Sequence, residues 1–483
     1  MYLGIDLGTS SLKALLITDD QQVVGSTSSS LIVSRPESGW SEQDPQHWIE
    51  ALQAAMSALK SQHPKELGAV RAIGLSGQMH GATLLDKHDA VLRPCMLWND
   101  SRAHKQAQIL DGQAIFRQQT GNIVFPGFTA PKAMWVENNE PDVFSKIAKI
   151  LLPKDYLRLW LTGEYVSEMS DASGTSWLDV GKRKWSSELL ESCALSLDQM
   201  PKLVEGSEPS GILKAKIASQ WGMENNVIVA GGAGDNAATA IGMGIQKNGD
   251  AFLSLGTSGV VFAATNNFLP KPESAIHAFC HALPDKWHQM GVVLSATDSL
   301  NWYANITQSS AKELTQPLGD QLKAPSGITF LPYLSGERTP HNDANIRGAF
   351  TGLDHRSDRE TLTQAVLEGV AFAIKDNLMA LEEAGTKLTG VTVAGGGSKS
   401  EYWLKLMATI LNVSVKVPKA GELGAVFGAA RLAMLSEGNC KIDDICTSPV
   451  IKNIFEPQTN LIDDYDDAYS RYKSLYSQIK ETP

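Results

Sequence analysis

Two acidic residues lie where a carboxylate could take part in phosphoryl transfer. Asp6 ends an apolar strand directly before the turn Gly8-Thr9-Ser10, and Asp235 follows the strand and glycine turn at residues 226–234. A carboxylate at Asp6 would face any phosphate held by the turn, so we expect it to help hold Mg²⁺ through the waters of the ion. Asp235 could be the general base that removes the proton from an attacking hydroxyl group. Each also has a structural alternative, because Asp6 could stabilise the turn and Asp235 could cap a helix.

Two turns of identical sequence could hold phosphate groups. Gly8-Thr9-Ser10 and Gly256-Thr257-Ser258 each lie between two apolar strands and would offer free backbone N–H groups and hydroxyls within a small radius. Lys13, on the strand that leaves the first turn, could meet a phosphate as a point charge. Plain hairpins are the alternative for both turns. Because the chain contains neither GxxxxGKS nor GxxxxGKT, a P-loop is excluded.

A polar cluster follows the strand predicted at residues 70–75. It places Gln78, Met79 and His80 between glycines, which suits a small polyhydroxyl ligand better than a hydrophobic core; a structural role is the alternative for the histidine. Residues 232–237 fit the dinucleotide pattern GxGxxA. However, the acid expected about 20 residues later would fall within the second Gly-Thr-Ser turn, so we do not predict a dinucleotide site.

Apolar patterning indicates the elements that position the first turn. Residues 3–7, 12–17 and 22–27 predict three antiparallel strands. Asp44 and Pro45 predict the cap and the first residue of a helix that covers these strands.

The second half of the chain repeats part of this plan. The recurrence of Gly-Thr-Ser between strands indicates two related halves with a boundary near residues 245–250. Residues 361–383 predict a long helix. The spacing of Ser398 and Glu401 predicts a capping box after the glycine turn at residues 395–397.

The composition excludes several classes of protein. The chain has 483 residues, and 42 Lys plus Arg against 53 Asp plus Glu give a net charge of −11, which disfavours a nucleic-acid binder. With 43% apolar and 20% charged residues the chain is globular rather than disordered. Its length predicts two large domains.

The cysteines and the first residues of the chain indicate a cytoplasmic protein. The five cysteines are scattered and contain no CxxC pair, so neither a disulfide framework nor a zinc site is expected. The first residues lack the positive region of a secretory signal, and no uncharged stretch is a convincing membrane span. We therefore expect a cytoplasmic protein with no membrane partner.

Together these residues resemble the FGGY carbohydrate kinases, members of the actin, sugar kinase and Hsp70 ATPase superfamily. The resemblance covers the whole chain, and within the family the chain is most similar to the xylulokinases. It rests on eight motifs that occur in order: residues 4–10 (GIDLGTS), 76–81 (SGQMHG), 97–100 (LWND), 126–132 (PGFTAPK), 152–157 (LPKDYL), 233–237 (AGDNA), 336–341 (GERTPH) and 394–397 (AGGG).

The resemblance implies an α/β fold of two RNase H-like domains with a ligand cleft between them. Residues 1–246 would bind mainly the sugar and residues 247–483 mainly ATP, with Mg²⁺ as cofactor. Asp235 would be the catalytic base and would also hold the hydroxyl that is phosphorylated. The other implied contacts are Met79, His80 and Asn236 for the sugar; Gly8, Thr9, Ser10, Lys13, Gly256 and Thr257 for the phosphates; and Gly396, Gly397 and Ser400 for the adenosine.

The resemblance implies phosphorylation of D-xylulose to D-xylulose 5-phosphate by ATP, a step of xylose catabolism. Ribulose, gluconate and glycerol are alternative substrates of the family. Gluconate is disfavoured because Gln78, Met79 and His80 include no cation for its carboxylate. A nucleotide-gated protein without catalysis is the alternative from a different class. The sequence does not fix the oligomeric state; a homodimer is among the states that it allows.

Overall fold

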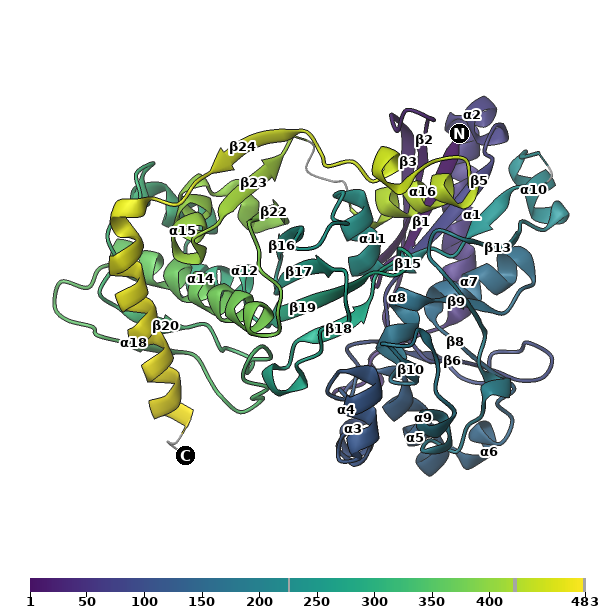
Figure 1. The fold of residues 1–483 in the computed structure, drawn as a ribbon, viewed down its shortest axis with the longest axis horizontal. Coiled ribbons are helices and arrows are strands. Elements are labelled where there is room, and N and C mark those ends of the chain that lie inside the picture. Colours follow the sequence, from purple (N-terminus) through teal and green to yellow (C-terminus); the bar gives the residue numbers. More distant parts are fainter. Residues whose placement is uncertain (225, 420–423, 481–483) are drawn as a thin grey trace.

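The computed structural model describes residues 1–224, 226–419 and 424–480. Figure 1 shows two bodies, each built on a mixed sheet flanked by helices. The two-domain α/β architecture predicted from the sequence is therefore present. Within the described part of the chain, every helix is too short or too polar to span a bilayer.

The sheet of the first body contains the three antiparallel strands predicted at its start. They are β1 (Tyr2–Leu7), β2 (Ser11–Ile17) and β3 (Val23–Ser30). The remaining strands follow β1 in the order β5 (Ala72–Gly77), β14 (Ile228–Ala230) and β13 (Pro209–Ile212), and β15 (Ala233–Gly234) pairs with β5 as well. Both β15 and β1 run parallel to β5, so their carboxyl ends lie at one edge of the sheet.

The helix predicted to cover this sheet is also confirmed. Helix α1 (Pro45–Gln62) begins at Pro45, and the Asp44 side chain accepts a hydrogen bond from the Gln46 N–H as its cap. Its buried face packs on β2 and β3.

The sheet of the second body repeats the arrangement of the first. Its strands have the order β18 (His277–Cys280), β19 (Trp287–Val293), β17 (Gly259–Thr265), β16 (Ala251–Leu255), β22 (Gly390–Ala394), β23 (Ser414–Pro418) and β24 (Ile451–Phe455). Strand β16 pairs antiparallel with β17 and parallel with β22, as β1 pairs with β2 and β5. The repeat inferred from the two Gly-Thr-Ser turns is thus a repeat of topology.

Two helices of the second body test the sequence predictions. The long helix is α14 (Arg359–Glu383), as expected. Helix α15 (Glu401–Leu411) is capped by Ser400, whose hydroxyl accepts a hydrogen bond from the Trp403 N–H. The predicted capping role of Ser398 is wrong, because a turn of 3₁₀ helix precedes α15 and the Ser398 hydroxyl instead donates to the Gly395 carbonyl.

A helix late in the chain packs against the first sheet. Figure 1 shows α16 (Ala425–Ser436), coloured as part of the C-terminal region, beside β1 and β2. Glycines permit this contact: a β-carbon at Gly74 would lie 1.8 Å from the Ala429 oxygen, and one at Gly428 would lie 1.7 Å from the oxygen of Ala238 in α11 (Asp235–Gly242). Helix α16 therefore holds α11 against the sheet, and the domain boundary at residue 246 stays a prediction.

Candidate functional site

Three strand ends of the first body bring the predicted acids together. In register, Asp6 of β1 lies beside Ser76 of β5, and Ser76 lies beside Ala233 of β15, two residues before Asp235. The Ser76 hydroxyl donates to Asp6 Oδ1 over 2.9 Å. On the other side, Lys13 of β2 lies opposite Asp6. Sequence positions far apart thus form one group at the carboxyl edge of the sheet.

Asp235 has the geometry of a proton acceptor. It is the first residue of α11, whose cap is Gly234, so the capping alternative is wrong. Asp235 Oδ1 accepts hydrogen bonds from the backbone N–H and the side-chain amide of Asn236, at 2.8 and 3.1 Å. Oδ2 accepts none from the described residues. Burial, and then the charge of Asp6, raise the pKa of Asp235 to about 7.

Asp6 is partly buried and lies close enough to Asp235 for its charge to raise the pKa of that carboxyl group. Burial raises the pKa of Asp6, whereas the Ser76 hydrogen bond and the charge of Lys13 lower it. The side chain makes no hydrogen bond to the following turn within the described residues, which does not support the turn-stabilising alternative. No cluster of three or more Asp, Glu, His or Cys that could hold a metal occurs in the described part of the chain. Two carboxylates fit Mg²⁺, which commonly takes one or two, with waters and phosphate oxygens as its other ligands.

The first Gly-Thr-Ser turn leaves two donors unused. The Gly8 N–H bonds the Ser11 carbonyl across the turn, while the N–H groups of Thr9 and Ser10 meet no acceptor among the described residues. The Thr9 hydroxyl is already engaged, because it donates to Gln78 and accepts from the indole of Trp98. Backbone N–H groups, rather than the threonine hydroxyl, are therefore what this turn offers to an anion.

The second turn has the same pattern and lies beside the glycine turn after β22. The Gly256 N–H bonds the Ser258 carbonyl, and the N–H groups of Thr257 and Ser258 lack acceptors in the described chain. A β-carbon at Gly395 would lie 2.5 Å from the Leu255 oxygen, so the two turns are in contact. Gly396, next in the chain, has open space around it.

The remaining two residues predicted at the adenosine are engaged in packing and capping. Gly397 is buried against Leu255 and Trp403, where a β-carbon would be crowded. Ser400 caps α15. The two bodies thus hold separate groups of predicted residues, and no hydrogen bond joins the two groups among the residues described.

Met79 and His80 lie next to the acid group. A β-carbon at Gly234, beside Asp235, would lie 2.9 Å from the sulfur of Met79. His80 has φ +69°, a strained backbone of the kind that clusters at functional sites. Its Nδ1 donates to the Gly174 carbonyl at 2.7 Å, which leaves Nε2 as an acceptor. Burial lowers the pKa of His80 to about 3, so the ring is neutral.

The sequence analysis missed several residues that surround His80. The Lys132 ammonium donates to the His80 carbonyl over 2.9 Å and is fully buried. Phe128 stacks on the imidazole, with ring centroids 4.5 Å apart. Arg338, of the second body, lies 4.6 Å above the ring of Phe125. Lys132, Phe128 and Arg338 belong to motifs of the family resemblance, which was the available signal, but nothing in their spacing showed that they meet.

A buried cluster of charges supports the loop that carries Asp235. Its members are Lys154, Asp155 and Arg158 of α7 (Pro153–Thr162), Glu168 at the end of β9 (Val166–Glu168), and Asp171 of α8 (Met169–Ala172); all five side chains are 0% exposed. Arg158 donates to the carbonyls of Ala230 and Gly231, at 2.7 and 2.6 Å. Ser170 donates to Glu168 and accepts the N–H of Gly234. Through Ser170, the cluster is therefore hydrogen-bonded to Gly234, the residue directly before Asp235.

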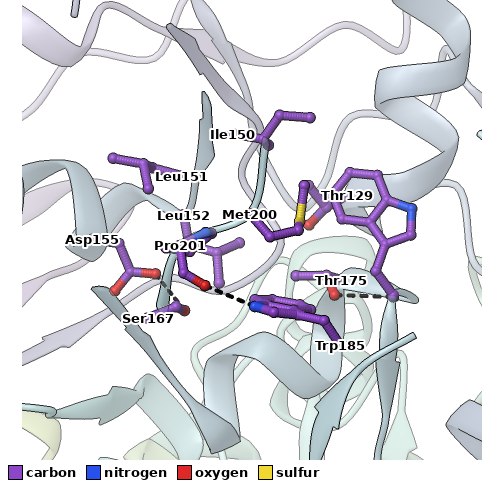
Figure 2. Close-up of a pocket in the computed structure, with 11 residues that line it drawn as sticks. Thr129, Ile150, Leu151, Leu152, Asp155, Ser167, Thr175, Trp185, Met200 and Pro201 are labelled. Atoms are coloured by element: carbon purple, nitrogen blue, oxygen red, sulfur yellow. Dashed lines mark hydrogen bonds between the residues drawn. The ribbon is translucent and has the colours of Figure 1, made fainter. Parts of the chain in front are cut away.

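The cluster borders a small cavity. Figure 2 shows Asp155 and Ser167 at its edge, joined by a hydrogen bond of 2.6 Å, with Trp185 and Met200 opposite. The volume of about 10 Å³ suits one water molecule. This volume is too small for a sugar, and the residues that the sequence predicts at the sugar do not line the cavity.

The strand ends of the first body carry two carboxylates, and the two turns have backbone N–H groups without acceptors among the described residues. Phosphoryl transfer uses groups of these kinds.

Comparison with known proteins shows the family of this chain. Residues 1–242 match the N-terminal domain, and residues 251–437 the C-terminal domain, of the FGGY family of carbohydrate kinases. The xylulose kinase of Escherichia coli (strain K12) is 46% identical over 482 residues, 99% of this chain and 99% of that protein. The crystal structure of a xyloylose kinase from Brucella ovis is 60% identical, has a TM-score of 0.99 and covers 100% of both chains. That of a gluconate kinase from Lactobacillus acidophilus is 25% identical, with a TM-score of 0.92 and coverage of 99% of this chain and 98% of that one. The resemblance and the predicted fold are confirmed, and this chain belongs to the FGGY family of carbohydrate kinases.

Proposed function

We propose that this enzyme transfers the γ-phosphoryl group of ATP to the terminal hydroxyl of D-xylulose and forms D-xylulose 5-phosphate. One observation carries the chemistry. Asp235, which has a pKa of about 7, lies near Asp6 at the strand ends, next to the first Gly-Thr-Ser turn. Among the described residues, Asp235 Oδ2 accepts no hydrogen bond and two N–H groups of that turn have no acceptor. Relatives named xylulose kinase support the choice of sugar.

In the proposed reaction, the hydroxyl oxygen of the sugar forms a bond to the γ-phosphorus while the bond from that phosphorus to the ADP oxygen breaks. The hydroxyl proton passes to Asp235 Oδ2. The N–H groups of Thr9, Ser10 and Thr257, with the ammonium of Lys13, would stabilise the charge on the transferring group. Mg²⁺, held near Asp6, would neutralise phosphate charge when bound.

The remaining roles also stay proposals. Met79, His80 and Asn236 would contact the sugar, with His80 Nε2 accepting a hydrogen bond from a hydroxyl group. Gly396 and the neighbouring turn would lie against the adenosine. Residues 1–246 would contribute mainly to the sugar site and residues 247–483 mainly to the ATP site. A cytoplasmic location and the oligomeric state remain predictions.

A coupled assay of ADP release tests the choice of substrate. We expect Mg-ATP turnover to be stimulated most strongly by D-xylulose in a panel with D-ribulose, L-ribulose, L-xylulose, gluconate and glycerol. Preference for another member of the panel would keep the kinase chemistry and contradict the sugar. ADP release that none of them stimulates would contradict the kinase function and favour a nucleotide-gated protein.

The raised pKa of Asp235 predicts the pH dependence of turnover. Only the carboxylate form can accept the hydroxyl proton, so kcat/KM for D-xylulose should rise with pH as Asp235 ionises around pH 7 and level off above. The measurement is kcat/KM between pH 5.5 and 8.5, with the Kd of D-xylulose taken over the same range to separate binding from catalysis. A profile that is flat or falls across this range would contradict Asp235 as the base.

A further inference from the structure

Arg338 extends from the second body into the aromatic group of the first. Its guanidinium carbon lies 4.6 Å from the ring centroid of Phe125, and Phe125 contacts Phe128 with 5.6 Å between ring centroids. Phe128 in turn stacks on His80. In this series of contacts, Met79 and His80 come between Asp235 and Arg338.

Apart from the Phe125 ring, the guanidinium has no ion-pair or hydrogen-bond partner among the described residues. The side chain is nevertheless only partly exposed. The adjacent Glu337 does not pair with it, since Glu337 Oε1 accepts from the backbone N–H groups of Leu294 and Arg338. Burial lowers the pKa of Arg338. A desolvated cation without acceptors is costly unless a ligand supplies them.

Hydrogen bonds hold the backbone next to Arg338, and the guanidinium lies against Phe125. The Thr339 hydroxyl donates to the Ala275 carbonyl at 3.0 Å and accepts from the Val292 N–H at 3.1 Å. The Thr339 N–H donates to the Val292 carbonyl. These bonds attach the segment to β19 and to the residues before β18, which places Arg338 before any ligand binds.

We propose that Arg338 is a substrate-binding residue that donates hydrogen bonds to the oxygen atoms of the sugar at the end remote from the phosphorylated hydroxyl. This inference rests on the proposed function and deepens it. A guanidinium has five N–H donors and no acceptor, so it selects a sugar end with closely spaced acceptor oxygens, such as the carbonyl and neighbouring hydroxyl of a ketose. It also supplies the cation that the cluster at residues 78–80 lacks, which removes the sequence argument against gluconate.

The test compares Arg338→Met and Arg338→Lys with wild type. Loss of a hydrogen bond to a charged donor predicts a rise of about 10- to 100-fold in KM for D-xylulose with Arg338→Met, and KM for ATP within twofold of wild type. Arg338→Lys keeps the charge without the fork of donors, so its KM should be intermediate. Arg347→Met is the matched control, because this arginine is exposed and, within the described ranges, donates only to the carbonyls of Ala344 and Ile346.

The outcomes separate this inference from the function itself. If wild type phosphorylates D-xylulose and Arg338→Met leaves its KM within twofold, the inference is overturned and the function stands. If KM for both substrates rises together and the melting temperature falls, the role is structural and the inference is likewise overturned. If wild type instead prefers gluconate, the proposed sugar fails, and a raised KM for gluconate in Arg338→Met would still support Arg338 as the ligand of the sugar oxygens.

Discussion

Replacing Asp235 by Asn is expected to lower kcat for sugar phosphorylation by about 10²- to 10⁴-fold, the usual contribution of a general base. The amide keeps an oxygen for the two hydrogen bonds from Asn236 but cannot accept the hydroxyl proton at the position of Oδ2. Steady-state kinetics with D-xylulose measure the loss, and titration calorimetry with Mg-ATP and with the sugar measures binding. Both Kd values should stay within about threefold of wild type.

The control for this substitution is Asp463→Asn. Asp463 is an exposed acid in the first turn of α18 (Ile462–Lys480), far along the chain from the strand ends. Its variant should keep wild-type kcat. If Asp235→Asn retains kcat within tenfold of wild type, or if Asp463→Asn loses activity equally, Asp235 is not the base.

Replacing Lys154 by Met is expected to lower the free energy of unfolding by about 3–5 kcal/mol. The ammonium lies 2.9 Å from Asp155, 3.3 Å from Glu168 and 3.0 Å from Asp171, and all four side chains are fully buried. Burial lowers its pKa, but the three carboxylates raise it more. Burial raises the pKa of Asp171 and the charge of Lys154 lowers it, so the two cations of the cluster, Lys154 and Arg158, balance its acidic charge. Removal of Lys154 leaves this balance short of a positive charge.

Urea unfolding followed by tryptophan fluorescence measures this loss. The matched control is Lys182→Met, because Lys182 pairs with Asp179 over a similar distance, 2.8 Å, but is 67% exposed. That variant should change stability by less than about 1 kcal/mol. The double variant Lys154→Met with Asp155→Asn should recover part of the loss. A change below about 1 kcal/mol for Lys154→Met alone would contradict the role of the cluster.

Local sequence patterns predicted the strand ends and turns because each is defined by a few consecutive residues. An apolar run before Gly8 specifies β1 and its turn, and Asp44 followed by Pro45 specifies the start of α1. The cap at Ser398 failed for a local reason too: four residues of 3₁₀ helix follow Gly395 and delay α15, so the cap falls on Ser400.

Contacts between distant segments could not be predicted in this way. Nothing near Arg338 in the chain shows that it reaches Phe125, more than two hundred positions earlier. Nor does the sequence around Gly428 show that α16 returns to pack on α11 and the first sheet. Both contacts depend on tertiary packing. The periodicity of a sequence indicates which face of a helix or strand is buried, but not which distant segment packs against that face.

The central claim is transfer of phosphoryl to a sugar hydroxyl, and analysis of the products tests it most directly. Wild-type enzyme would be incubated with Mg-ATP and D-xylulose labelled with ¹³C at carbon 5, and the products followed by ³¹P and ¹³C NMR. We expect one ADP for each sugar phosphate and coupling between phosphorus and the labelled carbon. ADP with inorganic phosphate and no such coupling, or phosphate at another carbon, would contradict the proposed reaction.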